Sequence, residues 1–145
     1  MALAIKKIML WRAEVHNRPG ALAATLEPVA KARVDLKVVM GYRHPGAEGK
    51  AAIEVFPISS KKAAAAGSSA GLAAAEIPAL LVEGDNKPGL GYSIARAIAA
   101  AGINIAFFVA QVIGRKFAAV IGFETEDDAK KAMLAIKSAG RGTWP

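Results

Sequence analysis

Apolar and polar residues alternate over several short stretches of the chain, which is the pattern of β-strands with one buried face. In the first stretch, residues 8–15, Trp11 and Ala13 share one face while Arg12 and Glu14 share the other. The same alternation predicts strands at residues 34–40, 50–56, 103–109 and 117–124, and Leu80 and Val82 mark a further strand.

Two segments, 21–32 and 90–101, have the apolar spacing of helices, as with Leu90, Ile94 and Ile98 in the later one. Pro28 falls inside the earlier segment and predicts a kink or an early end, because proline removes a helical hydrogen bond.

Two further helices are predicted, one later in each half of the chain. Thr125 and Asp128 form a capping box in front of a helix. Its buried face consists of Ala129, Ala132, Met133 and Ile136. The other helix, residues 61–66, is expected to be short because glycine and serine follow it.

An internal repeat organises these elements. The turn Asn17-Arg18-Pro19-Gly20 recurs 69 positions later as Asn86-Lys87-Pro88-Gly89, and Lys61-Lys62-Ala63 recurs at the same offset as Lys130-Lys131-Ala132. We therefore predict two domains, residues 5–72 and 73–145. Ile53 aligns with Ile121 at an offset of 68, which predicts a one-residue slip after the intervening hairpin.

Each copy has the order strand, helix, strand, strand, helix and a weakly marked final strand. This order predicts an α+β fold of two ferredoxin-like βαββαβ domains, each an antiparallel sheet with its helices on one face. The final strands can only be residues 72–76 and 142–145. The hairpins are expected to differ, with a long loop at residues 42–49 containing a solvated His44, and a tight turn at residues 113–116.

The amino-acid composition excludes several classes of functional site. The 145 residues include no cysteine and only two histidines. Disulfide scaffolds, iron–sulfur clusters, thiolate metal sites and cysteine nucleophiles are therefore excluded, and no zinc or iron site is expected because the histidines lack ligand spacing. Without a Ser/His/Asp constellation, a carboxylate pair or a phosphate loop, we predict no enzymatic activity and no cofactor.

Charge and hydropathy restrict the partners. The net charge of +7 lies mostly in residues 1–72, where it can indicate anionic partners or simply solvated lysines. No apolar run reaches the roughly 18 residues needed to cross a bilayer, and Lys6 and Lys7 interrupt the apolar N-terminus. We expect a cytoplasmic protein that does not enter a membrane.

The two turns carry a family resemblance. Residues 14–22 and 83–90, together with Gly102-Ile103-Asn104-Ile105, resemble the first strand, turn and second-strand start of ACT domains, the small-molecule regulatory modules of amino-acid metabolism. The resemblance extends from about residue 5 to residue 140. It implies a tandem ACT protein that binds an amino acid at the turns and near domain interfaces.

The ligand-binding residues implied by the resemblance are Asn17, Arg18, Pro19, Gly20, Ala21 and Leu22 in the first copy, and Asn86, Lys87, Pro88, Gly89 and Leu90 in the second. The resemblance also places Asp35 and Asn104, at the second-strand starts, near a ligand held by a neighbouring domain. Such a turn suits a carboxylate because a helix N-terminus presents unpaired N–H groups. Each of these residues also has a purely structural interpretation as a turn former or a local hydrogen-bonding group.

Three functions remain open. The first is a free amino-acid sensor, and the second is the regulatory subunit of a separate amino-acid biosynthetic enzyme. RNA binding shares the topology, but neither third strand carries the required aromatic motif, so a nucleic-acid partner is not favoured. A homodimer is expected because apolar sheet faces, with Ile8 and Leu10 in one copy and Ile77, Ala79 and Leu81 in the other, need covering.

Overall fold

The structure, a computed structural model, describes residues 3–140 and divides the chain into two compact units. One unit is Met9–Glu76, which we call the inserted unit. The other, the flanking unit, combines the residues up to Ile8 with those from Ile77 onward. The sequence-based boundaries, 5–72 and 73–145, are two consecutive pieces of chain, so they differ from these units at the N-terminal strand.

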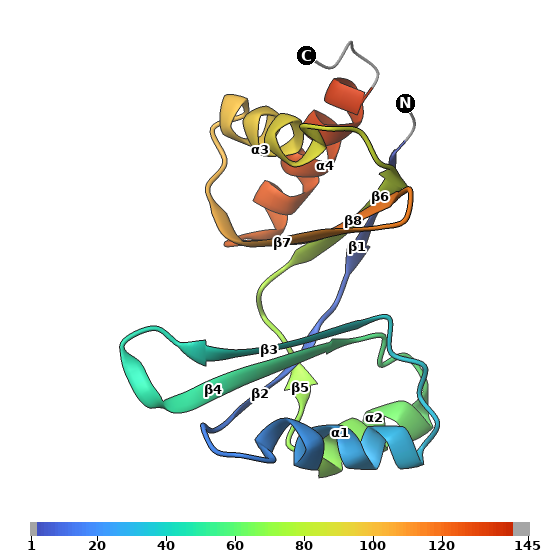
Figure 1. The fold of residues 1–145 in the computed structure, drawn as a ribbon, viewed down its shortest axis with the longest axis vertical. Helices are drawn as coiled ribbons and strands as arrows, with labels where there is room; N and C mark the ends of the chain where they lie inside the picture. The colour runs from blue at the N-terminus through green and yellow to red at the C-terminus, as the bar shows by residue number, and fades with distance from the viewer. Residues whose placement is uncertain (1–2, 141–145) are drawn as a thin grey trace. The chain divides into compact units, whose positions relative to one another are not determined.

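The inserted unit is one βαββαβ motif. Its elements are β2 (Trp11–His16), α1 (Ala21–Lys31), β3 (Val38–His44), β4 (Ala47–Phe56), α2 (Lys61–Ser69) and β5 (Ala73–Ala74). The strands lie in the order β3-β4-β2-β5, with every neighbouring pair antiparallel, and α1 and α2 cover one face (Figure 1). Val29, Ile53 and Val55 form the centre of the core between these layers.

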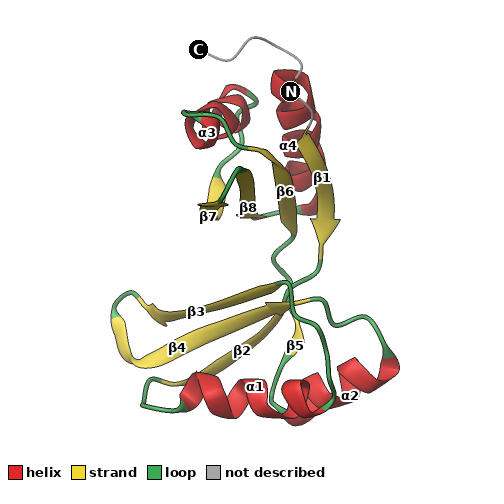
Figure 2. Cartoon of the chain, turned by 45° about the vertical axis from the view of Figure 1, so that its right-hand side comes forward, coloured by secondary structure: helices red, strands yellow, loops and turns green. Residues whose placement is uncertain are grey.

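The flanking unit repeats this arrangement. Its elements are β1 (Leu3–Ile8), β6 (Ala79–Asp85), α3 (Leu90–Ala100), β7 (Ile105–Ile113), β8 (Lys116–Phe123) and α4 (Glu126–Gly140). The antiparallel sheet has the order β1-β6-β8-β7, and α3 and α4 lie on one face of it (Figure 2). Ile94, Ile98 and Ile136 are fully buried in its core. The α+β fold with two antiparallel four-stranded sheets is therefore confirmed.

The fourth strand of the flanking sheet comes from the other end of the chain. β1 pairs with β6 from Leu3 opposite Gly84 to Ile8 opposite Ala79, and Leu3 and Ile5 pack against the core cluster of this unit. The predicted strand 8–15 is therefore wrong at its start, because the chain leaves one sheet after Ile8 and enters the other at Trp11. The predicted final strand 142–145 lies outside the described residues.

The helices differ from expectation in the first copy. Instead of ending early at Pro28, α1 continues to Lys31. Likewise, α2 extends through Gly67 to Ser69, and a Cβ at Gly67 would lie 3.2 Å from Trp11 Cε3, so glycine permits close packing there. The predicted cap of α4 is confirmed, since the Asp128 N–H donates to Thr125 Oγ1. None of the helices within residues 3–140 is long and apolar enough to span a bilayer.

The first hairpin is a strand pair rather than a long loop. β3 and β4 extend to a two-residue turn at Pro45-Gly46, with an irregularity after Arg43. Seven residues (44–50) separate the partners Arg43 and Ala51, whereas four (113–116) separate Val112 and Phe117. The first hairpin is therefore three residues longer than the second, whereas the sequence alignment predicted a difference of one residue.

This insertion changes the alignment of the two copies. Ala13 pairs with Ile53, and Val82, 69 positions after Ala13, pairs with Ala119. Ile53 therefore corresponds to Ala119, and its predicted alignment with Ile121 is wrong because alanine-rich strands carry little pattern. Arg43 pairs with Ala51 as Val112 pairs with Phe117, so Arg43 in the first copy corresponds to Val112 in the second, and Ala51 corresponds to Phe117.

Candidate functional site

The first turn, residues 17–20, connects β2 to α1 and is fastened to the β3–β4 hairpin. The backbone N–H of Asn17 donates to the Gly49 carbonyl and its Nδ2 to the Glu48 carbonyl, both at 3.0 Å. Gly20 precedes α1 with a φ of 87°, a left-handed conformation that glycine adopts without strain. Asn17 thus fixes the turn against the hairpin.

Beside this turn lies a hollow of about 310 Å³, which we call the first-turn hollow. Four of the predicted ligand-binding residues line it, Asn17, Arg18, Ala21 and Leu22. The remaining lining residues come from the sheet: Val15 of β2, Gly41, Tyr42 and Arg43 of β3, and Ala51, Ala52 and Ile53 of β4. Pro19 and Gly20 belong to the turn but do not line the hollow.

The first-turn hollow has a cationic character. Arg18 and Arg43 are the charged residues that line it, and none of its lining residues is acidic. The first turn of α1 also contains no acidic residue, so the positive end of the helix is not neutralised by its own side chains. Most other lining residues are apolar, so the hollow combines two guanidinium groups with an aliphatic wall.

The second turn, residues 86–89, has the same backbone but different surroundings. Gly89 has a φ of 84°, and the Asn86 N–H donates to the Arg115 carbonyl at 2.8 Å. Lys87 and Pro88 are exposed beside it. Leu90 is only 2% exposed and belongs to the core, whereas Leu22 at the neighbouring position of the first helix is 43% exposed.

The two residues expected at second-strand starts lie away from the first-turn hollow. Asp35 Oδ2 is 2.6 Å from Lys37 Nζ, and Asn104 Nδ2 donates to Glu124 Oε1 at 3.1 Å. Neither lines the hollow. Their expected role, contact with a ligand held by a neighbouring domain, stays a prediction.

The sequence missed the β3 wall of the hollow. Gly41, Tyr42 and Arg43 line it, yet residues 42–49 were expected to form a loop. Pro45-Gly46, the kind of dipeptide that closes a hairpin, was the signal that could have placed them on a strand.

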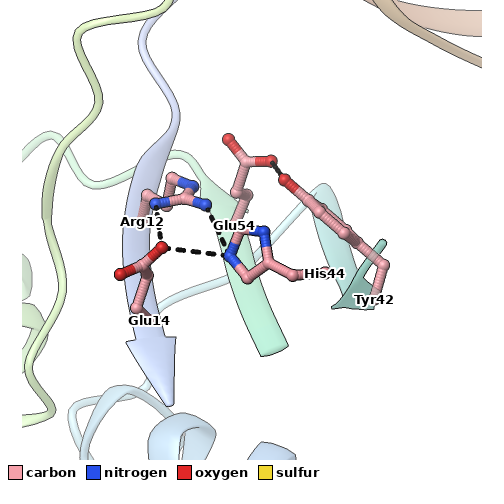
Figure 3. Close-up of polar contacts among 5 residues, drawn as sticks. All are labelled: Arg12, Glu14, Tyr42, His44 and Glu54. Carbon is pink, nitrogen blue, oxygen red and sulfur yellow. Dashed lines mark hydrogen bonds and ion pairs between the residues drawn. The ribbon is translucent and has the colours of Figure 1, made fainter. Parts of the chain in front are cut away.

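A second polar cluster lies on the sheet face of the inserted unit away from its helices (Figure 3). His44 Nε2 lies 3.0 Å from Glu14 Oε1 and 3.2 Å from Arg12 Nη2. The Tyr42 hydroxyl donates to Glu54 Oε2 at 2.9 Å, and Glu54 is only 1% exposed. His44 is therefore a strand residue in a polar network, not a solvated loop residue.

Tyr42 provides a test of this network. Burial, then the hydrogen bond to Glu54 and its charge, raise the pKa of Tyr42 above its usual value, while Arg12 lowers it to a smaller extent. Because the protonated form is neutral, the folded state holds this proton more tightly than the unfolded chain. The contribution to stability is fully present below the unfolded pKa of about 10 and is lost as pH rises through the folded value.

We expect Glu54→Gln to lower the Tyr42 pKa only part of the way, because burial remains. Absorbance titration near 295 nm in a Tyr92→Phe background isolates Tyr42, since the chain has two tyrosines. An unchanged titration in the Glu54 variant would contradict the Tyr42–Glu54 contact.

Comparisons with known proteins address the fold. No protein-family model and no curated protein matches the sequence. Among solved structures, protein BT0572 from Bacteroides thetaiotaomicron is similar, with a TM-score of 0.74, 17% identity, and coverage of 94% of this chain and 90% of that one.

Two further similar structures carry a named role. The regulatory subunit of aspartate kinase from Thermus thermophilus has a TM-score of 0.63 and 17% identity over 96% of this chain and 97% of that one. Escherichia coli aspartokinase III, in complex with aspartate and ADP, has a TM-score of 0.59 and 12% identity over 95% of this chain and 33% of that one. The resemblance is thus confirmed at the level of structure: the chain has the tandem ACT fold of aspartate kinase regulatory domains.

Proposed function

We propose that this chain is a non-catalytic regulatory protein that binds a small metabolite, with amino acids as the first candidate class, at the first-turn hollow. The observation that carries the proposal is the hollow itself, which brings Asn17, Arg18, Ala21 and Leu22 together with β3 and β4. A similar structure of nearly equal length is the regulatory subunit of an aspartate kinase, which supports a regulatory role.

The chemistry of the hollow supports binding rather than catalysis. Its lining residues include no serine, threonine, histidine, lysine or carboxylate that could act as a nucleophile or general base. The one lining hydroxyl, that of Tyr42, donates to Glu54. Arginine and asparagine can orient a carboxylate without reacting with it.

Calorimetric titration of the full chain with each of the twenty amino acids tests the proposal. We expect at least one to bind, and we expect Arg18→Ala to weaken that binding by about tenfold, as for the loss of a charge-assisted hydrogen bond. Lys87→Ala, in the second turn, is the matched control and should bind normally if the first-turn hollow is the site. Absence of heat from all twenty amino acids would count against this ligand class.

A second candidate is a regulatory subunit of a separate amino-acid biosynthetic enzyme, which the name of the Thermus thermophilus protein favours. Under this second proposal, the chain forms a homodimer that contacts a separate catalytic subunit. Tagged chain purified from its own cells, with and without the ligand identified by calorimetry, separates the two candidates. A stoichiometric kinase or other synthetic enzyme in the eluate supports the subunit, whereas a homodimer alone in both samples supports a free sensor.

A further inference from the structure

The two turns share a motif but differ in the space beside them. Ala21 begins α1 where Leu90 begins α3, and Ala51 corresponds to Phe117 through the paired strands. The two alanines line the first-turn hollow. Leu90 and Phe117 are 2% and 5% exposed and belong to the flanking core. At these two positions, therefore, the second copy has larger and buried side chains, whereas Val15, Leu22 and Ile53 of the hollow correspond to the smaller Gly84, Gly91 and Ala119.

The charged residues also differ between the two turns. Arg43, which lines the hollow, corresponds to Val112, and Arg18 corresponds to Lys87. The first turn thus has two guanidinium groups, whose planar donor pairs match a carboxylate. The second turn has one ammonium group in their place.

No acidic side chain lines the hollow to pair with a ligand ammonium group, which leaves neutral acceptors such as Asn17 Oδ1. None of the lining residues is acidic, and Glu48, which contacts Asn17, does so through its backbone carbonyl. The rest of the wall is largely aliphatic, with Val15, Leu22 and Ile53 among its members. The hollow therefore offers charged partners to a carboxylate and an aliphatic wall to a short apolar chain, but no ion pair to an ammonium group.

We infer that the first turn, and not the second, is the ligand site, and that it recognises a small aliphatic carboxylate without an ion pair to an α-ammonium group. This inference rests on the proposed function, because it specifies the ligand of the same hollow. It follows that a 2-oxo acid binds at least as tightly as the amino acid with the same carbon skeleton.

Three probes with one carbon skeleton test the inference by calorimetry on the full chain: L-leucine, 4-methyl-2-oxopentanoate and L-leucinamide. We expect both acids to bind, the oxo acid at least as tightly as leucine. Leucinamide, which lacks the carboxylate, should bind at least about tenfold more weakly, because hydrogen bonds to charged groups contribute more than neutral ones.

Variants that introduce second-copy residues test the assignment to the first turn. Arg43→Val should weaken binding of the oxo acid by about 10- to 100-fold, and Ala51→Phe should abolish it by filling the hollow. Circular dichroism confirms that each variant is folded, and Arg43→Val, on an exposed part of β3, keeps the test valid if Ala51→Phe misfolds. Lys87→Ala is the control and should change the affinity less than twofold.

The outcomes separate this inference from the proposed function. Binding of leucine without the oxo acid, or of leucinamide as tightly as leucine, overturns the inference and leaves the proposed function standing. Loss of binding in Lys87→Ala but not in Arg43→Val overturns the choice of turn. No binding of any of the three probes overturns the inference, and the twenty-amino-acid series then decides the proposed function independently.

Discussion

Replacing Ile5 by asparagine is expected to lower the free energy of unfolding of the flanking unit by about 3 kcal/mol, from lost apolar burial and the cost of burying an amide. Ile5 lies on β1 and packs against the core formed by β6, β8, α3 and α4. It has no part in the core of the inserted unit. Hydrogen exchange should therefore accelerate in β6 and β8, while β2 and β4 keep their protection.

The neighbouring residue supplies a matched control. Ala4 is exposed and lies on the opposite side of the same strand, so Ala4→Asn introduces the same side chain into β1 without placing it in the core. We expect less than about 1 kcal/mol of destabilisation from it. Equal effects of the two substitutions would show that β1 does not bury its Ile5 face as described.

Replacing Gly122 by alanine is expected to destabilise the flanking unit by about 2 kcal/mol, in the range of other overpacked sites. A Cβ at Gly122 would lie 2.1 Å from Cε2 and 2.4 Å from Cδ2 of Phe107, its partner across the β7–β8 pair. Real carbon atoms do not approach so closely, and the Phe107 ring would have to leave its position over the glycine.

Removing the ring should relieve this conflict. In a double-mutant cycle, Phe107→Ala combined with Gly122→Ala should cost less than the two single changes together, with a coupling of about 1 to 2 kcal/mol. Urea denaturation of the four proteins measures the cycle. Additive costs would mean that the aromatic ring does not occupy the space above Gly122.

The repeated turns and most helices followed from the sequence because their signals are local. Proline and glycine mark the turns at residues 17–20 and 86–89, and Thr125 marks the start of α4 by a bond to Asp128. Each signal depends on residues within one turn of the chain. These elements therefore have the expected positions, to within a residue or two.

The origin of the fourth flanking strand could not be predicted, because strand pairing over long distances leaves no local mark. Exposure alternates over Leu3–Lys6 before Lys7 breaks the pattern, and residues 11–16 alternate between apolar and polar side chains as a strand requires. Two residues, Met9 and Leu10, separate them, so one continuous strand fitted the pattern equally well. Only the pairing of β1 with β6 distinguishes the two arrangements.

The wall of the candidate site was missed for a different reason. Arg43 and Gly41 gain their importance from lying opposite Ala51 and Ile53 across the sheet. Three extra residues in the hairpin shift this register, and alanines on β4 give no apolar pattern that would reveal the shift. The turn motif thus located one side of the hollow, while the other side depended on a register that the sequence does not encode locally.

The interleaved order of the strands has a consequence for synthesis on the ribosome. The segment that becomes β1 is made before the inserted unit, but its partner β6 begins only at Ala79. At the usual 5 to 20 residues per second, β1 waits roughly 4 to 14 seconds for its partner. The inserted unit is complete by Glu76, before any residue of β6 has been made, so it can begin to fold before the flanking unit has all its strands. Synthesis therefore favours an order of folding in which the flanking unit forms after the inserted unit, because its β1 strand is made well before its partner β6.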